Sequence, residues 1–110
     1  MIPERSIVIA VQDGVSISTI VCALARSGGT FSPRENDNFG GLYYYSNDFP
    51  HGEMYVFQNR DPIDGEPYYD IAGPTAVVLR IDNPSSESAA ISRAISAALG
   101  VRCQLVNGDT

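Results

Sequence analysis

The chain has 110 residues, of which 44% are apolar and 18% charged, and its formal net charge is −6. This length suits one domain with one hydrophobic core, and the composition excludes a largely disordered chain. All seven basic residues are arginines, scattered singly along an acidic chain that repels phosphate, so we expect no nucleic-acid binding. The negative field would instead attract a basic partner.

Membrane insertion and secretion are also disfavoured. No stretch approaches the roughly 20 apolar residues that a membrane helix needs. The apolar run at residues 7–11 lacks the basic start and the cleavage site of a signal peptide. We therefore expect a cytoplasmic protein that makes no membrane contact.

The first third of the chain predicts a strand followed by a helix. Residues 6–12 are short and β-branched, as in a buried strand. Asp13 or Ser16 can cap a helix that Gly28-Gly29 would end. The apolar residues of this helix recur at helical spacing: Ile17, Ile20, Val21 and Leu24. Residues 30–41 are predicted to be mostly loop, with at most a short strand at their start.

Two aromatic stretches, residues 42–46 and 54–58, predict a hairpin with a long loop containing proline and glycine. Residues 59–74 contain three prolines and two glycines, so we expect an irregular, exposed segment. A loop of this length in a small domain is usually functional or flexible.

The last third predicts a strand, a helix and a final strand. Residues 75–82 form a clear strand pattern and residues 101–107 another. Between them, Asn83 is the expected helix N-cap, Pro84 the first helical residue and Glu87 a member of the first turn. Gly100 is expected to end this helix.

These elements predict a single α+β domain over residues 1–110, with irregular excursions at about 30–41 and 59–74. Two helices would cover one face of a mainly antiparallel sheet in a two-layer sandwich. The order βαβββαβ resembles a ferredoxin-like arrangement with an inserted aromatic hairpin and a long loop. This likeness concerns topology alone and carries no function.

The two faces of the predicted sheet differ in character, because successive side chains of a strand point to opposite sides. One face is apolar and is expected to meet the helices: Ile7, Ile9, Val11, Thr75, Val77, Leu79, Ile81, Val101, Cys103 and Leu105. The other mixes apolar and polar groups: Val8, Ala10, Ala76, Val78, Arg80, Arg102, Gln104 and Val106. We expect residues 30–74 or a second protein chain to cover it, the latter in a homodimer or with another partner.

No sequence motif assigns a reaction. Asp48, His51 and Glu53 could hold a metal or a general base, but their spacing is common in solvated turns. The acidic residues of the 59–74 segment do not match a calcium loop. Cys22 and Cys103 fit no zinc or CxxC motif and are predicted to be buried and unreactive. We therefore predict no catalytic residue, no metal and no cofactor.

Both faces of the predicted hairpin are aromatic or apolar. In its first strand Leu42 and Tyr44 point to one side and Tyr43 and Tyr45 to the other; in its second strand Met54 and Val56 point away from Tyr55 and Phe57. One face can pack on the domain, and the other can meet a partner, as tyrosines often do at interfaces. Alternatively, the tyrosines line the edge of a small core and place their hydroxyl groups in water.

The leading functional hypothesis is a small acidic, non-enzymatic module that binds a protein, for example an inhibitor or immunity-type protein that masks a basic target. It would use the hairpin and the acidic loop around Tyr68 and Tyr69. The alternative is a small-molecule-binding or enzymatic domain with a pocket between hairpin and sheet. There Arg80 or Arg102 would bind an anionic group, assisted by His51 or a tyrosine. The candidate binding residues are Tyr43, Tyr45, His51, Tyr55, Tyr68, Tyr69, Arg80 and Arg102.

Overall fold

The computed structural model describes residues 6–11, 15–69, 72–73 and 75–107. Within these ranges the chain is a small α+β domain with six strands and two α-helices. The strands are β1 Ser6–Val11, β2 Ser32–Asn36, β3 Gly41–Ser46, β4 Glu53–Gln58, β5 Val77–Asp82 and β6 Cys103–Asn107. The helices are α1 Ile17–Arg26 and α2 Ser88–Leu99, and a single 3-10 turn, η1, spans Asp37–Phe39.

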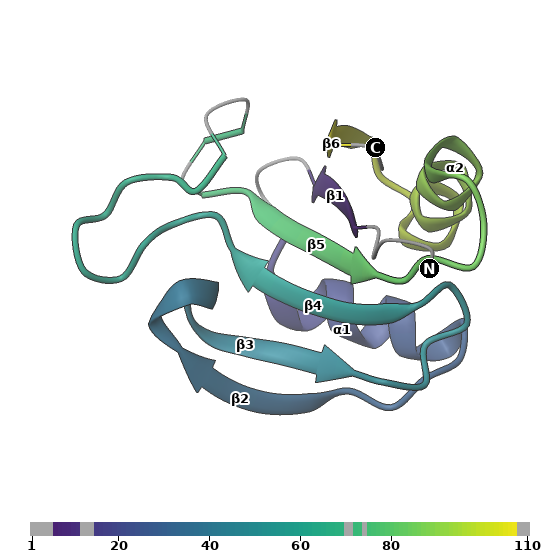
Figure 1. Cartoon of the computed structure of the whole chain (residues 1–110), viewed down its shortest axis with the longest axis horizontal. Helices are drawn as coiled ribbons and strands as arrows, with labels where there is room; N and C mark the ends of the chain where they lie inside the picture. The colour runs from purple at the N-terminus through teal and green to yellow at the C-terminus, as the bar shows by residue number, and fades with distance from the viewer. Residues whose placement is uncertain (1–5, 12–14, 70–71, 74, 108–110) are drawn as a thin grey trace, which may run out of the picture.

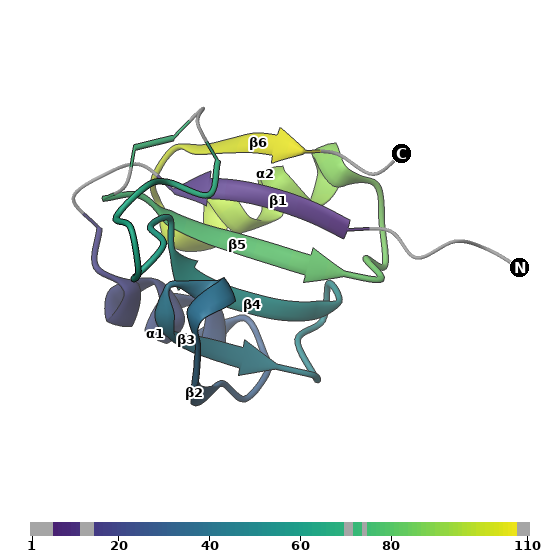
Figure 2. The same cartoon turned by 60° about the vertical axis from the view of Figure 1, so that its left-hand side comes forward.

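All six strands belong to one antiparallel sheet in the order β2-β3-β4-β5-β1-β6 (Figure 1). The two helices lie together behind this sheet in the view of Figure 2. The core between helices and sheet contains the expected apolar residues of β1 and β5, and Val101, Cys103 and Leu105 pack against it while partly buried. Thr75, which was also expected there, is exposed and precedes β5. The buried members of this core are Ile7, Ile9, Val11, Ile20, Leu24, Phe49, Met54, Val56, Val77, Leu79, Ile81, Ile91 and Ile95.

The first helix begins and ends as its sequence predicts. Ser16 is the N-cap, and its hydroxyl group accepts a hydrogen bond from the backbone N–H of Thr19 at 3.2 Å. After Arg26 the chain turns through Gly28, whose φ of 114° suits glycine. Asp13, the other proposed cap, lies outside the described residues. Neither α-helix in the described ranges is long and apolar enough to cross a membrane.

The predicted start of the second helix is wrong. Asn83 adopts a left-handed φ of 51° instead of capping a helix, and α2 begins only at Ser88 after Glu87. The intervening segment is tied to the hairpin loop, because Ser85 donates its N–H to the carbonyl of His51 at 3.0 Å. The hydrogen bond between Ser85 and His51 keeps this segment out of the helix, although its sequence is compatible with a first helical turn.

Residues 30–41 contain more regular structure than expected. Ser32–Asn36 forms β2, an edge strand paired along its full length with β3, and η1 follows it directly. The hairpin of β3 and β4 does not fold over the sheet but continues it edge to edge, since β4 pairs with β5 from Glu53–Asp82 to Gln58–Val77. The hairpin's two faces are therefore the two faces of the sheet itself.

The helix-free face of the sheet carries a second apolar cluster, with Val8, Tyr43, Phe57 and Val78 buried. Side chains from outside the strands cover it: Phe39 of η1, and Tyr68 and Tyr69 of the segment that follows β4. In Figure 2, η1 and this segment lie in front of the sheet, opposite the helices. The 30–74 excursion thus covers part of this face within the same chain.

Asn59 holds that segment in place. The side chain is fully buried, and its Nδ2 donates to the backbone carbonyls of Tyr69, Ala72 and Gly73 at 2.9–3.1 Å. Its Oδ1 accepts the backbone N–H of Tyr69 at 3.0 Å. One amide side chain therefore organises the described part of the 59–73 segment, which contains no strand or helix.

Candidate functional site

A row of large side chains crosses the middle of the helix-free face. Tyr45 of β3 pairs with Tyr55 of β4, and Tyr55 pairs with Arg80 of β5. Since cross-strand partners share a face, this register places the three side chains next to one another. Arg34 of β2 and Phe39 of η1 complete the row, which we call the aromatic–arginine band.

The band is held together by ring stacking and by cation–π contacts. The guanidinium carbon of Arg34 lies 4.3 Å from the ring centroid of Tyr45, and that of Arg80 lies 5.6 Å from the ring of Tyr55. The rings of Tyr45 and Tyr55 are 5.1 Å apart, and Phe39 stacks on Tyr55 at 5.0 Å. The band therefore has a cation at each end of the tyrosine pair.

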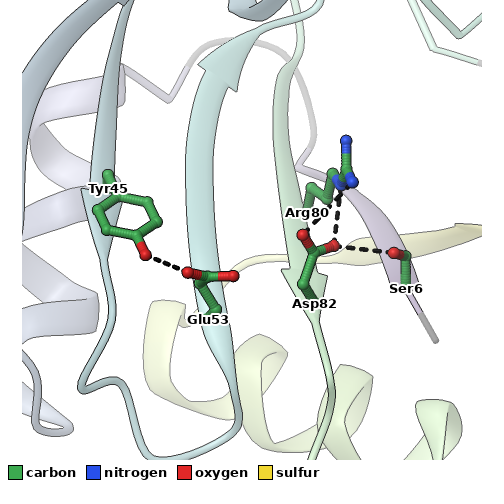
Figure 3. Close-up of polar contacts among 5 residues, drawn as sticks. All are labelled: Ser6, Tyr45, Glu53, Arg80 and Asp82. Atoms are coloured by element: carbon green, nitrogen blue, oxygen red, sulfur yellow. Dashed lines mark hydrogen bonds and ion pairs between the residues drawn. The ribbon is translucent and has the colours of Figure 1, made fainter. Parts of the chain in front are cut away.

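Two carboxylates accompany the band on neighbouring strands (Figure 3). The hydroxyl group of Tyr45 donates a hydrogen bond to Glu53. Asp82 accepts hydrogen bonds from Nε of Arg80 at 2.9 Å and from the hydroxyl of Ser6 at 2.8 Å. The charge of Arg80 is thus neutralised by a neighbour, whereas Arg34 makes no ion pair with any described residue.

These carboxylates also change the titration of the tyrosines. The hydrogen bond to Glu53, together with burial, raises the pKa of Tyr45 to about 12. Burial, followed by the charge of Glu53, raises the pKa of Tyr55. Both phenols consequently stay neutral hydrogen-bonding groups at physiological pH, and neither is activated as a base.

The structure brings together six of the eight candidate residues. Tyr45, Tyr55 and Arg80 are partly exposed in the band, and Tyr43 lies beneath it with 8% of its surface exposed. Tyr68 and Tyr69 pack against the same apolar cluster. His51 contacts instead the ring of Phe49, which belongs to the helix-side core, and Arg102 is exposed just before β6.

The acidic groups near His51 do not converge on it. Asp48 accepts hydrogen bonds from the N–H of Thr30 and the hydroxyl of Ser46, both at 2.8 Å, and these bonds lower its pKa. Glu53 is engaged by Tyr45. In the described ranges, no group of three or more His, Cys, Asp or Glu side chains could hold a metal ion. Asp48 is thus a structural acceptor in the hairpin loop.

The cysteines differ from each other and, in part, from expectation. Cys22 lies on the exposed side of α1, so its predicted burial is wrong: the apolar stripe of α1 passes beside it through Ile20 and Leu24. Cys103 is half-buried against the helix-side core, and burial raises the pKa of its thiol. Both thiols are free.

The alternative hypothesis placed a pocket between the hairpin and the sheet. The hairpin is itself part of the sheet, because β4 is hydrogen-bonded directly to β5, so no gap separates these two strands. A small pocket of about 150 Å³ occurs elsewhere, lined by Gly40, Gln58, Arg60 and Pro62. Among the described residues that line it, Arg60 is the one charged side chain and there is no cluster of titratable groups. The band is therefore the better candidate for a functional site.

Three contributors to the band and its surroundings were not among the residues considered from the sequence: Arg34, Phe39 and Asp82. Glu53 was considered only with Asp48 and His51, for a metal or a general base, and not as a partner of Tyr45. Arg34 could have been found only with the strand pairing of β2, which its sequence signals weakly. Phe39 owes its position to η1 and to the left-handed φ of 72° at Gly40. Glu53 and Asp82 directly flank the row, and strand alternation alone could have placed each on the face of Tyr55 and Arg80.

Comparisons of the chain with models of protein families, with curated proteins and with solved structures gave no significant match.

Proposed function

We propose that this chain is a small, acidic, non-enzymatic module that binds a protein partner through the aromatic–arginine band. The observation that carries the proposal is the band itself: partly exposed Tyr45 and Tyr55 with Arg34 and Arg80, on a face that the chain itself covers in part. Tyrosine is among the residue types that most often dominate binding energy at protein interfaces.

The preferred partner is basic. The net charge of −6 favours encounter with a positive surface, and Glu53 and Asp82 place carboxylates beside the exposed rings. An inhibitor or immunity-type protein that masks a basic target is one concrete form of this function. The band is built on four paired strands, β2 to β5, which supports this form of the function because a preorganised surface loses little conformational entropy on binding.

A capture experiment with matched baits tests the proposal. Tyr45→Ser removes a ring from the band, whereas Leu42→Ser changes the same strand on the opposite face, where Leu42 is 50% exposed. We expect the unchanged chain and Leu42→Ser to retain a basic protein from an extract of the source cell, and Tyr45→Ser to lose it. Equal retention by both variants, with both folded by circular dichroism, contradicts the proposal.

A homodimer through the sheet stays a second prediction. Phe39, Tyr68 and Tyr69 cover part of the face that such a dimer would use. The surface left for a dimer contact is then the band and the residues next to it. Light scattering over a concentration series distinguishes the two: a dimer whose formation Tyr45→Ser weakens supports self-association, and a monomer at high concentration excludes it.

We also propose that β1, α1, β4, β5, α2 and β6 make up a ferredoxin-like unit into which β2 and β3 are inserted. The neighbour relations β4-β5-β1-β6 and the placement of both helices on one face support this assignment. It concerns architecture and adds nothing to the functional argument.

A further inference from the structure

The contact between Arg34 and Tyr45 differs from the other cation–π contacts of the band. The guanidinium group of Arg80 lies over the ring of Tyr55, but it is also held by its ion pair with Asp82. Arg34 is exposed and lies on an edge strand, and its side chain makes no hydrogen bond or ion pair with any described residue. Its guanidinium group stacks on Tyr45 at 4.3 Å, which shows that this ring accepts a guanidinium group.

The surroundings of the Tyr45 ring suit a guanidinium group from another molecule as well. Glu53 receives the Tyr45 hydroxyl on Oε2, and in the described part of the chain Oε1 of Glu53 has no hydrogen-bond donor. An aromatic face beside a carboxylate is the combination that arginine recognises, by stacking on the ring and by donating N–H groups to the oxygens.

We propose that Tyr45 and Glu53 form a binding site for an arginine side chain of the protein partner, and that Arg34 occupies this site in the free protein. The inference rests on the proposed function and deepens it, because it names the side chain that the band recognises. Arg34 acts as an intramolecular competitor: the partner's arginine replaces it on the ring, and Arg34 swings into solvent from the sheet edge.

Arginine is preferred over lysine by this geometry. A planar guanidinium can stack on Tyr45 and still donate to a carboxylate, whereas an ammonium group is a more strongly hydrated point charge. Removal of Arg34 vacates the ring and also removes a positive charge that repels the incoming cation. Both effects strengthen binding of an arginine-containing partner.

Calorimetric titration of the full chain with a tetra-arginine and a tetralysine peptide, at one ionic strength, tests this site. We expect tighter binding of the arginine peptide, although the two peptides carry the same charge. Arg34→Ala should tighten it about two- to fivefold, as expected for loss of an exposed cation–π competitor. Glu53→Gln should weaken it. Aromatic NMR signals of Tyr45 should shift on binding.

Arg93→Ala is the matched control, because Arg93 is exposed on α2, away from the band, and its loss changes the net charge equally. Equal effects of Arg34→Ala and Arg93→Ala, or equal affinity for both peptides, mean binding by charge alone and overturn the site. Shifts of Tyr68 and Tyr69 without Tyr45 overturn the site but leave a basic partner supported. No binding by any variant contradicts both the site and the basic partner.

Discussion

The hydroxyl group of Tyr68 donates a hydrogen bond to the backbone carbonyl of Asp37 and accepts one from the N–H of Gly40 at 3.0 Å. One phenol thus joins the two segments that cover the helix-free face, η1 and the 59–73 segment. Phe39 lies between these two backbone contacts and stacks on Tyr55. Tyr68 therefore supports the ring of Tyr55 indirectly, by holding the backbone on both sides of Phe39.

Replacing Tyr68 by phenylalanine should loosen this cover while it keeps the ring. Loss of the hydroxyl leaves the carbonyl of Asp37 and the N–H of Gly40 without their partner, at a cost of about 1–2 kcal/mol in the free energy of unfolding. Amide hydrogen exchange at Gly40 should accelerate. Tyr44→Phe is the control, since the Tyr44 hydroxyl bonds to no described residue. Unchanged exchange at Gly40 would show that the cover does not need the hydroxyl.

Asn59→Ala should destabilise the protein more strongly. Four hydrogen bonds end on this fully buried side chain, and its loss leaves the carbonyls of Ala72 and Gly73 without the amide donor. We expect a loss of about 2–4 kcal/mol in urea unfolding. Asn47→Ala, at an exposed position in the hairpin loop, should change stability by less than about 0.5 kcal/mol. A small effect at Asn59 contradicts its role as organiser of the segment.

Gly52 marks a point where the hairpin loop touches β5. Its φ is 137°, and an added Cβ would lie 2.7 Å from Cγ2 of Ile81 and 2.8 Å from the carbonyl oxygen of Asp82. Gly52→Ala should therefore cost about 2–4 kcal/mol through strain and a backbone clash. At Gly65, where φ is 76° but nothing lies within 4 Å, alanine should cost only about 1 kcal/mol. Thermal denaturation of both variants measures the difference, and equal costs would contradict the close approach.

Tyr45 gives the protein a specific response to alkaline pH. Its pKa is raised from 10.0 to about 12 in the folded state, so folding favours the protonated phenol. This contribution to stability is fully present below pH 10 and is lost as the pH rises towards 12. Ultraviolet titration of tyrosinate should show a step near pH 12 that is absent in Tyr45→Phe and shifted towards the ordinary pKa in Glu53→Gln. Burial also raises the pKa of Tyr55, so the comparison rests on the step near pH 12. An unchanged step near pH 12 in Tyr45→Phe would refute the assignment.

The sequence was sufficient to predict the core because local alternation decides it. The apolar sets of β1, β5 and β6 and the stripe through Ile20 and Leu24 follow from periods of 2 and 3.6, and they lie where expected except for Thr75, which precedes β5 and is exposed. The start of α2 was wrong because a non-local bond from Ser85 to His51 overrides a good local capping sequence. β2 was nearly missed because Pro33 and its polar neighbours have low strand propensity and depend on pairing with β3.

The candidate site could be predicted in composition but not in arrangement. The density of tyrosines in the hairpin indicated which residues to consider, and alternation put Tyr43 and Tyr45 on one side of their strand. Only the register between β3 and β4 places Tyr55 on that side too. Their contact with Arg80 required the register between β4 and β5, which joins residues 25 positions apart. The exposure of Cys22 on α1 likewise required knowledge of how the helix is rotated on the sheet.

The most direct test of the account is hydroxyl-radical footprinting of the chain, alone and bound to a captured partner. We predict that Tyr45 and Tyr55 become protected on binding, whereas Leu42 on the opposite face of the same hairpin stays as reactive as in the free protein. Protection of Leu42 or of α1 and α2, with Tyr45 and Tyr55 unchanged, would show that the partner binds elsewhere and would contradict the central role of the aromatic–arginine band.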